Sequence, residues 1–443
     1  MGFLRALIGI AFFIGVAFLL SSNRKKIDWR IVGVGLGLQI FLGFVLIGGR
    51  ELNVGSDFVR VILNFIPNIF SVASEKFVTL LGYTEEGTRF IFGNLINDTN
   101  ENIGFIFAFK VLPTVIFFST LTAGLYYLGV LQLIVKGIAW VMAKTMRLSG
   151  AESLSAAGNI FLGQTEAPLL VKPFVANMTK SELLCLMTGG MATIAGGVLA
   201  GYVTMLGGNN PQEQAVFASY LLSASFMNAP AAIIMSKILL PELHSDKINT
   251  SLDVNTETLG VNLIDALANG ASEGLKLALN IGGMLLAFIA LIALLNGILG
   301  WVGDIAGINE VINSSTGGNF DALSIQYLLG QAFRVFAFFM GVEWGESSLV
   351  GSLLGQKLAA NEFIAYQGLQ NFMKAELLTK KSIVISTYAL CGFANFSSIA
   401  IQIGGIGGMA PTQQGNISKL GFKALFAATI ATMLTGTIAG AFF

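Results

Sequence analysis

The chain has 443 residues, of which 54% are hydrophobic and 11% are charged, and its formal net charge is zero. A soluble domain carries roughly 25% charged residues, so this composition excludes an ordinary soluble protein, and the balanced charge gives no sign of a nucleic-acid partner. Several runs without charged residues are long enough to cross a hydrocarbon core of roughly 30 Å. These runs are Leu183 to Gln212, Leu277 to Val302, Ser382 to Ser418 and Ala424 to Phe443. The sequence therefore predicts an all-α polytopic protein with the lipid bilayer as its surroundings.

The first predicted elements are two apolar spans, at about 3–20 and 31–49. Arg24, Lys25 and Lys26 follow the first span, which has no small-residue cleavage site, so we expect a retained span rather than a signal peptide. By the positive-inside rule, the end of the span beside these charges faces the cytoplasm.

The next elements alternate between the membrane interface and the membrane core. Residues 57–81 and 132–147 mix charged with apolar side chains, as interfacial amphipathic helices do. Between them, 83–101 is polar enough to predict a loop, and 103–130 is apolar enough to predict a third span.

Residues 151–178 are too interrupted for an ordinary span. Glu166 lies at their middle, among Gly158, Gly163, Pro168 and Pro173. A hairpin that enters and leaves the membrane on one side would suit this pattern, because protein or a water-filled cavity must satisfy non-helical backbone at membrane depth. An apolar segment interrupted near Ala192–Gly196 follows over 183–206, and 215–239 is another span.

The second half resembles the first in the order of its elements. A polar linker, 241–262, precedes a clean span over 277–302 and an apolar helix over 325–340. A Gly-rich acidic segment, 345–366, then leads into a broken span interrupted at Gly392–Ser398. Two acidic hairpins, each followed by a broken span, are typical of repeat-built secondary transporters.

Two carboxylates inside these segments predict a functional site. A carboxylate at bilayer depth costs about 2.5–3.5 kcal/mol, so we expect Glu166 and Glu362 to be used or paired. The alternative interpretations are structural ion pairs with Lys172 and Lys357, respectively. Cys185 and Cys391 fall in apolar segments and are expected to be buried small side chains. With His244 in a polar loop and no hydrolase-type motif, we do not expect an enzyme.

The polar side chains near these carboxylates suit a neutral, polyhydroxylated solute with a flat polar ring. Gln164 and Thr165 can pair with the donor and acceptor edge of a base, and Phe393 offers an apolar wall. Asn395 and Ser398 lie one helical turn apart and can bind hydroxyls, although such residues also join helices. Two carboxylates disfavour an anionic solute and leave a cationic one open.

The sequence specifies the coupling ion less clearly than it specifies the solute. Asn159 and Thr193 lie at the two breaks of the first half, where side-chain oxygens and freed carbonyls suit a hard cation. Proton coupling through Glu166 or Glu362 and an uncoupled channel remain alternatives.

Several motifs, in order, resemble those of the concentrative nucleoside transporters in their shorter bacterial form. The matching segments are Gly163 to Pro168, Ala195 to Tyr202, Ser225 to Ala231, Asn361 to Tyr366 and Cys391 to Ser398. The resemblance implies about eight spans, two re-entrant hairpins, interfacial helices and an internal inverted repeat. It also implies a homotrimer in a bacterial inner membrane that imports a nucleoside such as uridine with sodium. The mechanism would be elevator-type, with 148–240 and 342–443 as the moving transport parts and 1–147 and 241–341 largely as scaffold.

The resemblance assigns roles to individual residues. Gln164 and Thr165 should contact the base, with Glu166 nearby, and Val198 should pack against it. Phe393 should lie beside the nucleoside. The residues expected at the ribose hydroxyls are Glu362, Asn395 and Ser398. The expected sodium ligands are the side chains of Asn159 and Thr193 and the carbonyls of Leu162 and Ile194. Thr193 stands where the family pattern suggests serine.

Overall fold

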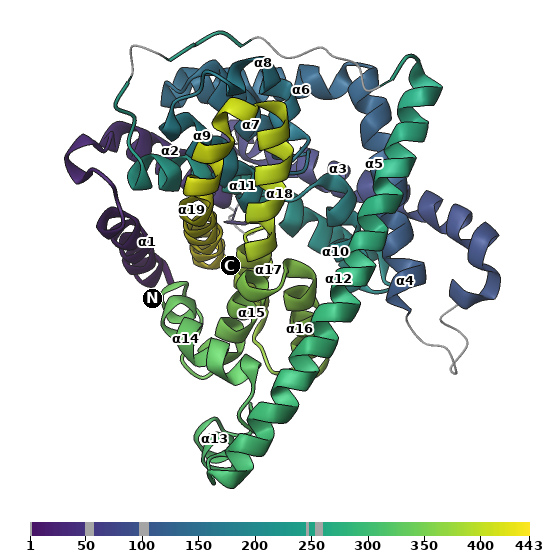
Figure 1. Cartoon of the computed structure of the whole chain (residues 1–443), viewed down its shortest axis with the longest axis vertical. Coiled ribbons are helices and arrows are strands. Elements are labelled where there is room, and N and C mark those ends of the chain that lie inside the picture. The colour runs from purple at the N-terminus through teal and green to yellow at the C-terminus, as the bar shows by residue number, and fades with distance from the viewer. Residues whose placement is uncertain (1, 49–56, 97–105, 245–247, 253–259) are drawn as a thin grey trace.

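The computed structural model describes residues 2–48, 57–96, 106–244, 248–252 and 260–443, and every regular element in them is helical (Figure 1). The first half contains α1 Gly2–Leu19, η1 Arg24–Lys26, α2 Trp29–Leu46, α3 Asp57–Phe92, η3 Gly93–Ile96, α4 Phe107–Lys110, α5 Leu112–Tyr127, α6 Val130–Met146, α7 Gly150–Gly158, η4 Ala167–Val171, α8 Lys172–Val175, α9 Lys180–Ala192, α10 Gly196–Gly207 and α11 Pro211–Leu239. The second half contains α12 Leu263–Ile305, α13 Asn309–Ser315, α14 Ile325–Phe339, α15 Ser347–Ala359, α16 Glu362–Lys374, α17 Lys380–Leu390, α18 Phe396–Met409, η6 Pro411–Gln413 and α19 Gln414–Ala441. The predicted all-α class is confirmed for these residues.

Six helical stretches among the described residues are long and apolar enough to cross a membrane. They are Trp29–Leu46, Phe107–Tyr127, Lys180–Gly207, Pro211–Leu239, Leu263–Ile305 and Pro411–Ala441. The helices α1 and α18 are apolar but shorter. This pattern agrees with a chain that crosses the membrane several times.

The predicted loop over 83–101 is wrong for its described part, because α3 continues through Phe92 and η3 follows it. Glu85 and Arg89 form an ion pair at 3.1 Å one helical turn apart on the exposed surface of α3. Pairs with this spacing support a surface helix whose composition is polar, which is why composition alone suggested a loop. Residues 97–101 of the predicted loop and much of the predicted linker over 241–262 lie outside the described residues.

The predicted span over 277–302 is too short, because α12 begins at Leu263. Asn262 caps this helix by accepting a hydrogen bond from the Asp265 backbone N–H at 2.9 Å. The charged residues of its first turns interrupt the apolar pattern without interrupting the helix, and Lys276 pairs with Glu273 at 2.7 Å.

The predicted breaks are present in both halves. The segment between α7 and η4 and the segment between α15 and α16 each separate two helical arms. Non-helical segments also separate α9 from α10 and α17 from α18. Thr179 and Thr379 start the broken spans as N-caps, accepting hydrogen bonds from the backbone N–H of Glu182 at 3.2 Å and Ser382 at 3.3 Å. A threonine hydroxyl in this position satisfies a free N–H of the first turn.

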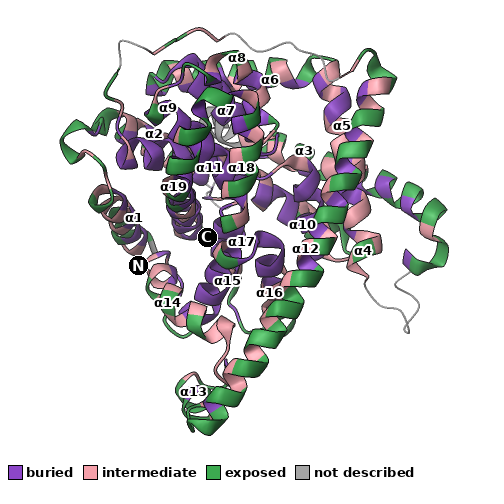
Figure 2. Cartoon of the chain, viewed as in Figure 1, coloured by how far each residue is buried: buried purple, intermediate pink, exposed green. Residues whose placement is uncertain are grey.

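The long helices differ sharply in how far they are buried (Figure 2). The most apolar windows of the α9–α10 stretch and of α11 are 89% and 83% buried, whereas that of α12 is only 11% buried. The α12 helix packs chiefly against α5 and leaves much of its surface exposed. The broken helices therefore form the interior of the molecule, and α12 stands at its periphery.

Candidate functional site

The first group of predicted site residues lies between α7 and η4. Gln164 is 7% exposed, and its Nε2 donates a hydrogen bond to Ser398 Oγ at 3.1 Å. Thr165 Oγ1 donates to Glu166 Oε2 at 3.3 Å, and the Glu166 side chain is exposed. Gly163 makes room for this arrangement, because a Cβ there would collide with the Glu166 carboxylate. Gln164 is therefore directed toward the second half of the chain, while Glu166 borders open space.

The second carboxylate, Glu362, lies in the first turn of α16 and is 4% exposed. The Tyr202 hydroxyl donates to Glu362 Oε1 at 2.8 Å, and Asn395 Nδ2 donates to Glu362 Oε2 at 3.1 Å. A helix N-terminus stabilises a nearby negative charge by roughly 0.3–1 kcal/mol. The buried charge of Glu362 is thus supported by two hydrogen bonds and a helix dipole.

The alternative interpretation of Glu362 as a contact ion-pair partner of Lys357 is wrong, although each of the two charges acts on the other from a greater distance. Lys357 Nζ instead donates to the Ala389 carbonyl at 2.9 Å and to Thr432 Oγ1 at 3.1 Å. Within the described ranges, no carboxylate lies at ion-pair distance from Lys357.

Asn395 also forms the N-cap of α18. Its Oδ1 accepts hydrogen bonds from the Ser398 backbone N–H at 3.0 Å and from Ser397 Oγ at 2.7 Å. The Asn395–Ser398 spacing therefore reflects a capped helix start rather than two side chains on one continuous helix face. One amide side chain fixes the start of α18 and contacts Glu362.

A single cavity of about 130 Å³ brings the two groups together. All eight side chains expected to contact substrate line it, namely Gln164, Thr165, Glu166, Val198, Glu362, Phe393, Asn395 and Ser398. Leu277, Ile281 and Met284 of α12 form another part of its lining. A neighbouring cavity of about 570 Å³ shares Thr165 and Glu166 with it and extends between α5 and α12. The predicted residues thus meet in a polar site with an apolar wall.

Sequence reasoning gave no role to several residues of this site. Tyr202 contacts Glu362, and a tyrosine in an apolar span is a residue type that often brings a polar group to a buried partner. Leu277, Ile281 and Met284 recur at helical spacing, a signal that identifies one face of α12 but not what that face meets.

The residues expected to hold sodium lie at the ends of α7 and α9. Asn159 is fully buried, and neither its Oδ1 nor its Nδ2 has a hydrogen-bond partner among the residues that the structure describes. It faces Gly189 of α9, where a Cβ would lie 2.9 Å from Asn159 Nδ2. Thr193 follows α9, and its Oγ1 donates to the Gly189 carbonyl at 2.9 Å.

This donor set fits a sodium ion. Leu162 and Ile194, whose carbonyls complete the expected set, are buried at the same two breaks. A buried amide without partners is costly unless a ligand satisfies it, and neutral oxygen donors suit a hard cation. The unpartnered side chain of Asn159 is therefore an independent sign of a binding site.

The two broken helices touch at their breaks. Gly392 has φ +147°, and a Cβ there would lie 2.6 Å from the Ala192 carbonyl oxygen, so only glycine fits without displacement. Asn228, in the middle of α11, donates from Nδ2 to the carbonyls of Ala192 and Cys391 at 2.8 Å each. One amide therefore joins the break of the first half to that of the second.

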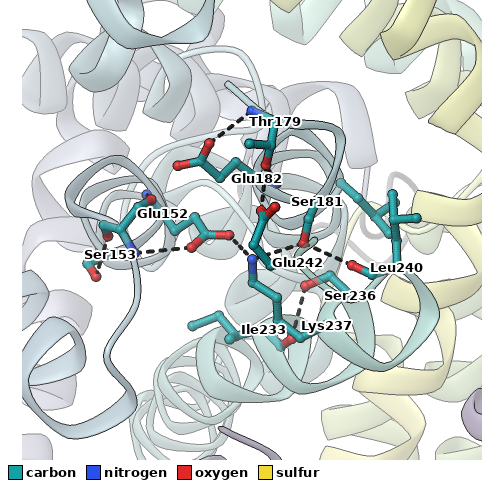
Figure 3. A network of polar contacts seen from close by, with 12 residues as sticks. Glu152, Ser153, Thr179, Ser181, Glu182, Ile233, Ser236, Lys237, Leu240 and Glu242 are labelled. Atoms are coloured by element: carbon teal, nitrogen blue, oxygen red, sulfur yellow. Dashed lines mark hydrogen bonds and ion pairs between the residues drawn. The ribbon is translucent and has the colours of Figure 1, made fainter. Parts of the chain in front are cut away.

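A buried polar network lies where α7, α9 and α11 meet (Figure 3). Lys237 of α11 forms an ion pair with Glu152 of α7 and donates to Ser181 Oγ at 3.0 Å. Both charged side chains are almost fully buried, so loss of one partner alone would cost about 3–5 kcal/mol. The network ties the first turns of α7 to α9 and α11 in the packed interior.

Three family models match successive parts of this chain and together cover most of it. The sodium-dependent nucleoside transporter N-terminus matches residues 8–95, the nucleoside recognition region called Gate matches 108–209, and the sodium-dependent nucleoside transporter C-terminus matches 220–440.

Individual proteins agree with this match. An uncharacterized transporter of Haemophilus influenzae is 41% identical over 100% of this chain and 98% of its own length. Sodium/nucleoside cotransporter 1 of Mus musculus is 37% identical over 98% of this chain and 62% of its own length. The structure of CNTnw in an inward-facing substrate-bound state has a TM-score of 0.86 and 39% identity, covering 100% of this chain and 98% of that chain. The resemblance drawn from the motifs is confirmed, and the chain belongs to the family of sodium-dependent nucleoside transporters, a family of multi-pass membrane proteins.

Proposed function

We propose that this chain imports nucleosides, uridine among them, across a bacterial inner membrane by symport with sodium. The observation that carries the proposal is the cavity lined by both hairpins and both broken helices. A solute bound there contacts elements of both halves, so its binding depends on how the halves are placed.

The sugar end of the proposed site is centred on Glu362. A carboxylate can accept about four hydrogen bonds. Tyr202 and Asn395 use two of these positions, which leaves acceptor positions for adjacent ribose hydroxyls. Ser398, beside Asn395, supplies a further hydroxyl at this end.

The base end of the proposed site is centred on Gln164 and Thr165. The Gln164 amide can donate and accept, as the edge of a nucleobase requires. Turning this amide toward the base would release the Ser398 hydroxyl for the sugar, since the two are hydrogen-bonded to each other. Val198 and Phe393 flank the ring, and the exposed Glu166 acts nearby through water.

The sodium site in this proposal consists of the side chains of Asn159 and Thr193 and the carbonyls of Leu162 and Ile194. The ion, when bound, supplies a positive charge that oxygens of two helix ends can share. Asn159 orients the end of α7, and Thr193 orients the end of α9 through its hydroxyl. The ordering of these ends would fix Gln164 and Val198, each a few residues along the chain.

The proposed movement is of the elevator type, with about eight spans and two re-entrant hairpins. Residues 148–240 and 342–443 would move as the transport part, while 1–147 and 241–341 would largely form the scaffold. The poor burial of α12 supports its scaffold role, because an exposed apolar helix needs lipid or another copy of the chain beside it. We accordingly propose a homotrimer.

Uptake of labelled uridine into proteoliposomes tests this function. We expect accumulation when an inward sodium gradient and an inside-negative potential are imposed. One charge crossing 100 mV contributes about 2.3 kcal/mol, enough to concentrate a neutral solute more than about tenfold.

Three other results would identify the alternatives. Uptake driven by a pH gradient without sodium would show proton coupling. Equilibration without accumulation would show a channel, and no uridine uptake under any gradient would refute nucleoside transport.

A further inference from the structure

Among the described residues, each half of the chain buries one lysine at a helix junction, and the two lysines have different surroundings. Lys237 is neutralised by Glu152 within the network of Figure 3. Lys357 is 2% exposed, and no carboxylate in the described part of the chain pairs with it. A buried charge without a contact ion pair is expensive, and Glu362 acts on Lys357 only from beyond ion-pair distance, so the ammonium also needs polar partners of its own.

The first of these polar partners is a helix C-terminus. Lys357 lies in the last turn of α15, and its Nζ reaches the Ala389 carbonyl in the last turn of α17, just before the second break. The free carbonyls at a helix C-terminus carry a partial negative charge of roughly one half.

The second acceptor comes from α19. Thr432 Oγ1 donates to the Thr429 carbonyl at 3.1 Å, so its oxygen is available to accept from the Lys357 ammonium. The ammonium is thus held by oxygens alone, as a small cation would be.

The first half has an uncharged residue in the corresponding place. Asn159 directly follows the last residue of α7, and Lys357 lies in the last turn of α15. Asn159 faces the last turn of α9 at Gly189. Asn159 brings an amide oxygen and no charge, so a positive charge at that break must come from an ion. Lys357 already brings a positive charge to the second break.

We propose that the Lys357 ammonium is a tethered cation at the second break, with the role there that sodium has at the first. It holds the carbonyl end of α17, and thereby the start of α18, where Asn395 contacts Glu362. Lys357 is in this sense a positioning residue for the sugar end of the site. A consequence is that the second break takes no sodium ion. The inference rests on the proposed function.

The sodium dependence of uridine binding separates this role from simple structural support. Binding would be measured by calorimetry on the purified full-length protein at a series of sodium concentrations, with choline as the replacement ion. The unaltered protein should show a Hill coefficient for sodium of about one. Lys357→Met should weaken uridine binding about tenfold at saturating sodium and keep that Hill coefficient, because methionine offers no oxygen ligand.

Lys357→Asn provides the sharper readout. Its amide oxygen, together with the Ala389 carbonyl and Thr432 Oγ1, would form an oxygen site open to a second sodium ion. Uridine affinity should then recover at high sodium and the Hill coefficient should rise toward about two. Sodium alone should also raise the melting temperature of this variant more than that of the unaltered protein.

The other buried lysine supplies the matched control. The double variant Glu152→Gln with Lys237→Met removes a buried lysine together with its partner. It should change the melting temperature while leaving the sodium dependence of uridine binding unaltered. An equal change of sodium dependence in this control would overturn the specific role of Lys357.

Other outcomes decide the proposal directly. A Hill coefficient near two for the unaltered protein, or Lys357 variants with unaltered affinity and sodium dependence, would overturn it. If the Lys357 variants do not fold, Thr432→Val tests the same contact, with an expected loss of about threefold that Thr432→Ser restores. Unchanged binding by Thr432→Val would then overturn the proposal. Failure of the unaltered protein to bind uridine would instead refute the proposed function itself.

Discussion

The break between α9 and α10 and the break between α17 and α18 share a backbone plan but differ in charge. Each follows a threonine-capped helix, and each lies beside the end of a helical arm, α7 at the first break and α15 at the second. At the first break the buried residue from that arm is Asn159, whose amide lacks a partner among the described residues. At the second it is Lys357, whose ammonium contacts a helix carbonyl. Similar architecture therefore does not imply similar chemistry, because one buried side chain decides whether a break already contains a cation.

The two carboxylates differ in the same way. Glu362 is buried and accepts hydrogen bonds from Tyr202 and Asn395, whereas Glu166 is exposed and accepts one from its neighbour Thr165. The carboxylate of the second half is thus held by side chains from two other parts of the chain, whereas that of the first half is held within its own segment. The following variants test these differences, in order of decreasing expected effect.

The largest effect is expected for Glu362→Gln. Charge-assisted hydrogen bonds contribute about 1.5–3 kcal/mol each, so their loss at the ribose should weaken uridine binding about 100-fold. The measurement is calorimetric titration with uridine at saturating sodium. Glu166→Gln is the matched control, with an expected loss of about threefold or less, and similar losses in both variants would contradict the division of roles.

The next effect is expected for Asn159→Ala, which removes the unpartnered amide of the first break. The sodium concentration for half-maximal uridine binding should rise about tenfold, since one oxygen ligand is lost. Thr188→Val is a suitable control, because the Thr188 hydroxyl bonds within α9 to the Leu184 carbonyl. Unaltered sodium dependence in Asn159→Ala would place the ion elsewhere.

The third variant, Asn228→Leu, tests the hydrogen-bonded link between the two breaks. It removes hydrogen bonds to Ala192 and Cys391 and leaves both carbonyls unsatisfied, at a cost of about 1–3 kcal/mol each. We expect the melting temperature in detergent to fall by about 5 °C or more. Ser225→Ala, which loses a single bond to the Ile160 carbonyl, should have a smaller effect. An equal fall in both variants would argue against a special role for the link between breaks.

The smallest effect is expected for Thr193→Ser. The hydroxyl that bonds the Gly189 carbonyl is retained and only a methyl group is lost. Sodium affinity should change by less than about threefold, whereas Thr193→Val, which loses the hydroxyl, should weaken it more. A larger effect for serine than for valine would show that packing, not the hydroxyl, matters at this position.

The class of the protein and the position of its irregular segments could be predicted from the amino-acid sequence alone. Charge-free apolar runs, and glycine and proline near Glu166, are local features whose effect on the backbone follows directly from hydrocarbon thickness and helix geometry. The family motifs selected the eight residues that line one cavity. Local composition failed over 83–96, where polar side chains cover helical structure supported by a surface ion pair. It also failed at the start of α12, where charged residues interrupt the apolar pattern without interrupting the helix.

The contacts between these residues could not be predicted in this way. Tyr202 and Glu362 are 160 positions apart, and Gln164 and Ser398 are 234 positions apart. No local pattern encodes such pairs, because they depend on how the two halves pack together. The same reason explains Lys357, for which an ion pair with Glu362 was one interpretation but whose ammonium contacts the last turn of α17, 32 positions away, and the interior of α19, 75 positions away. Charge and periodicity are properties of a segment, whereas the partner of a buried charge is a property of the fold.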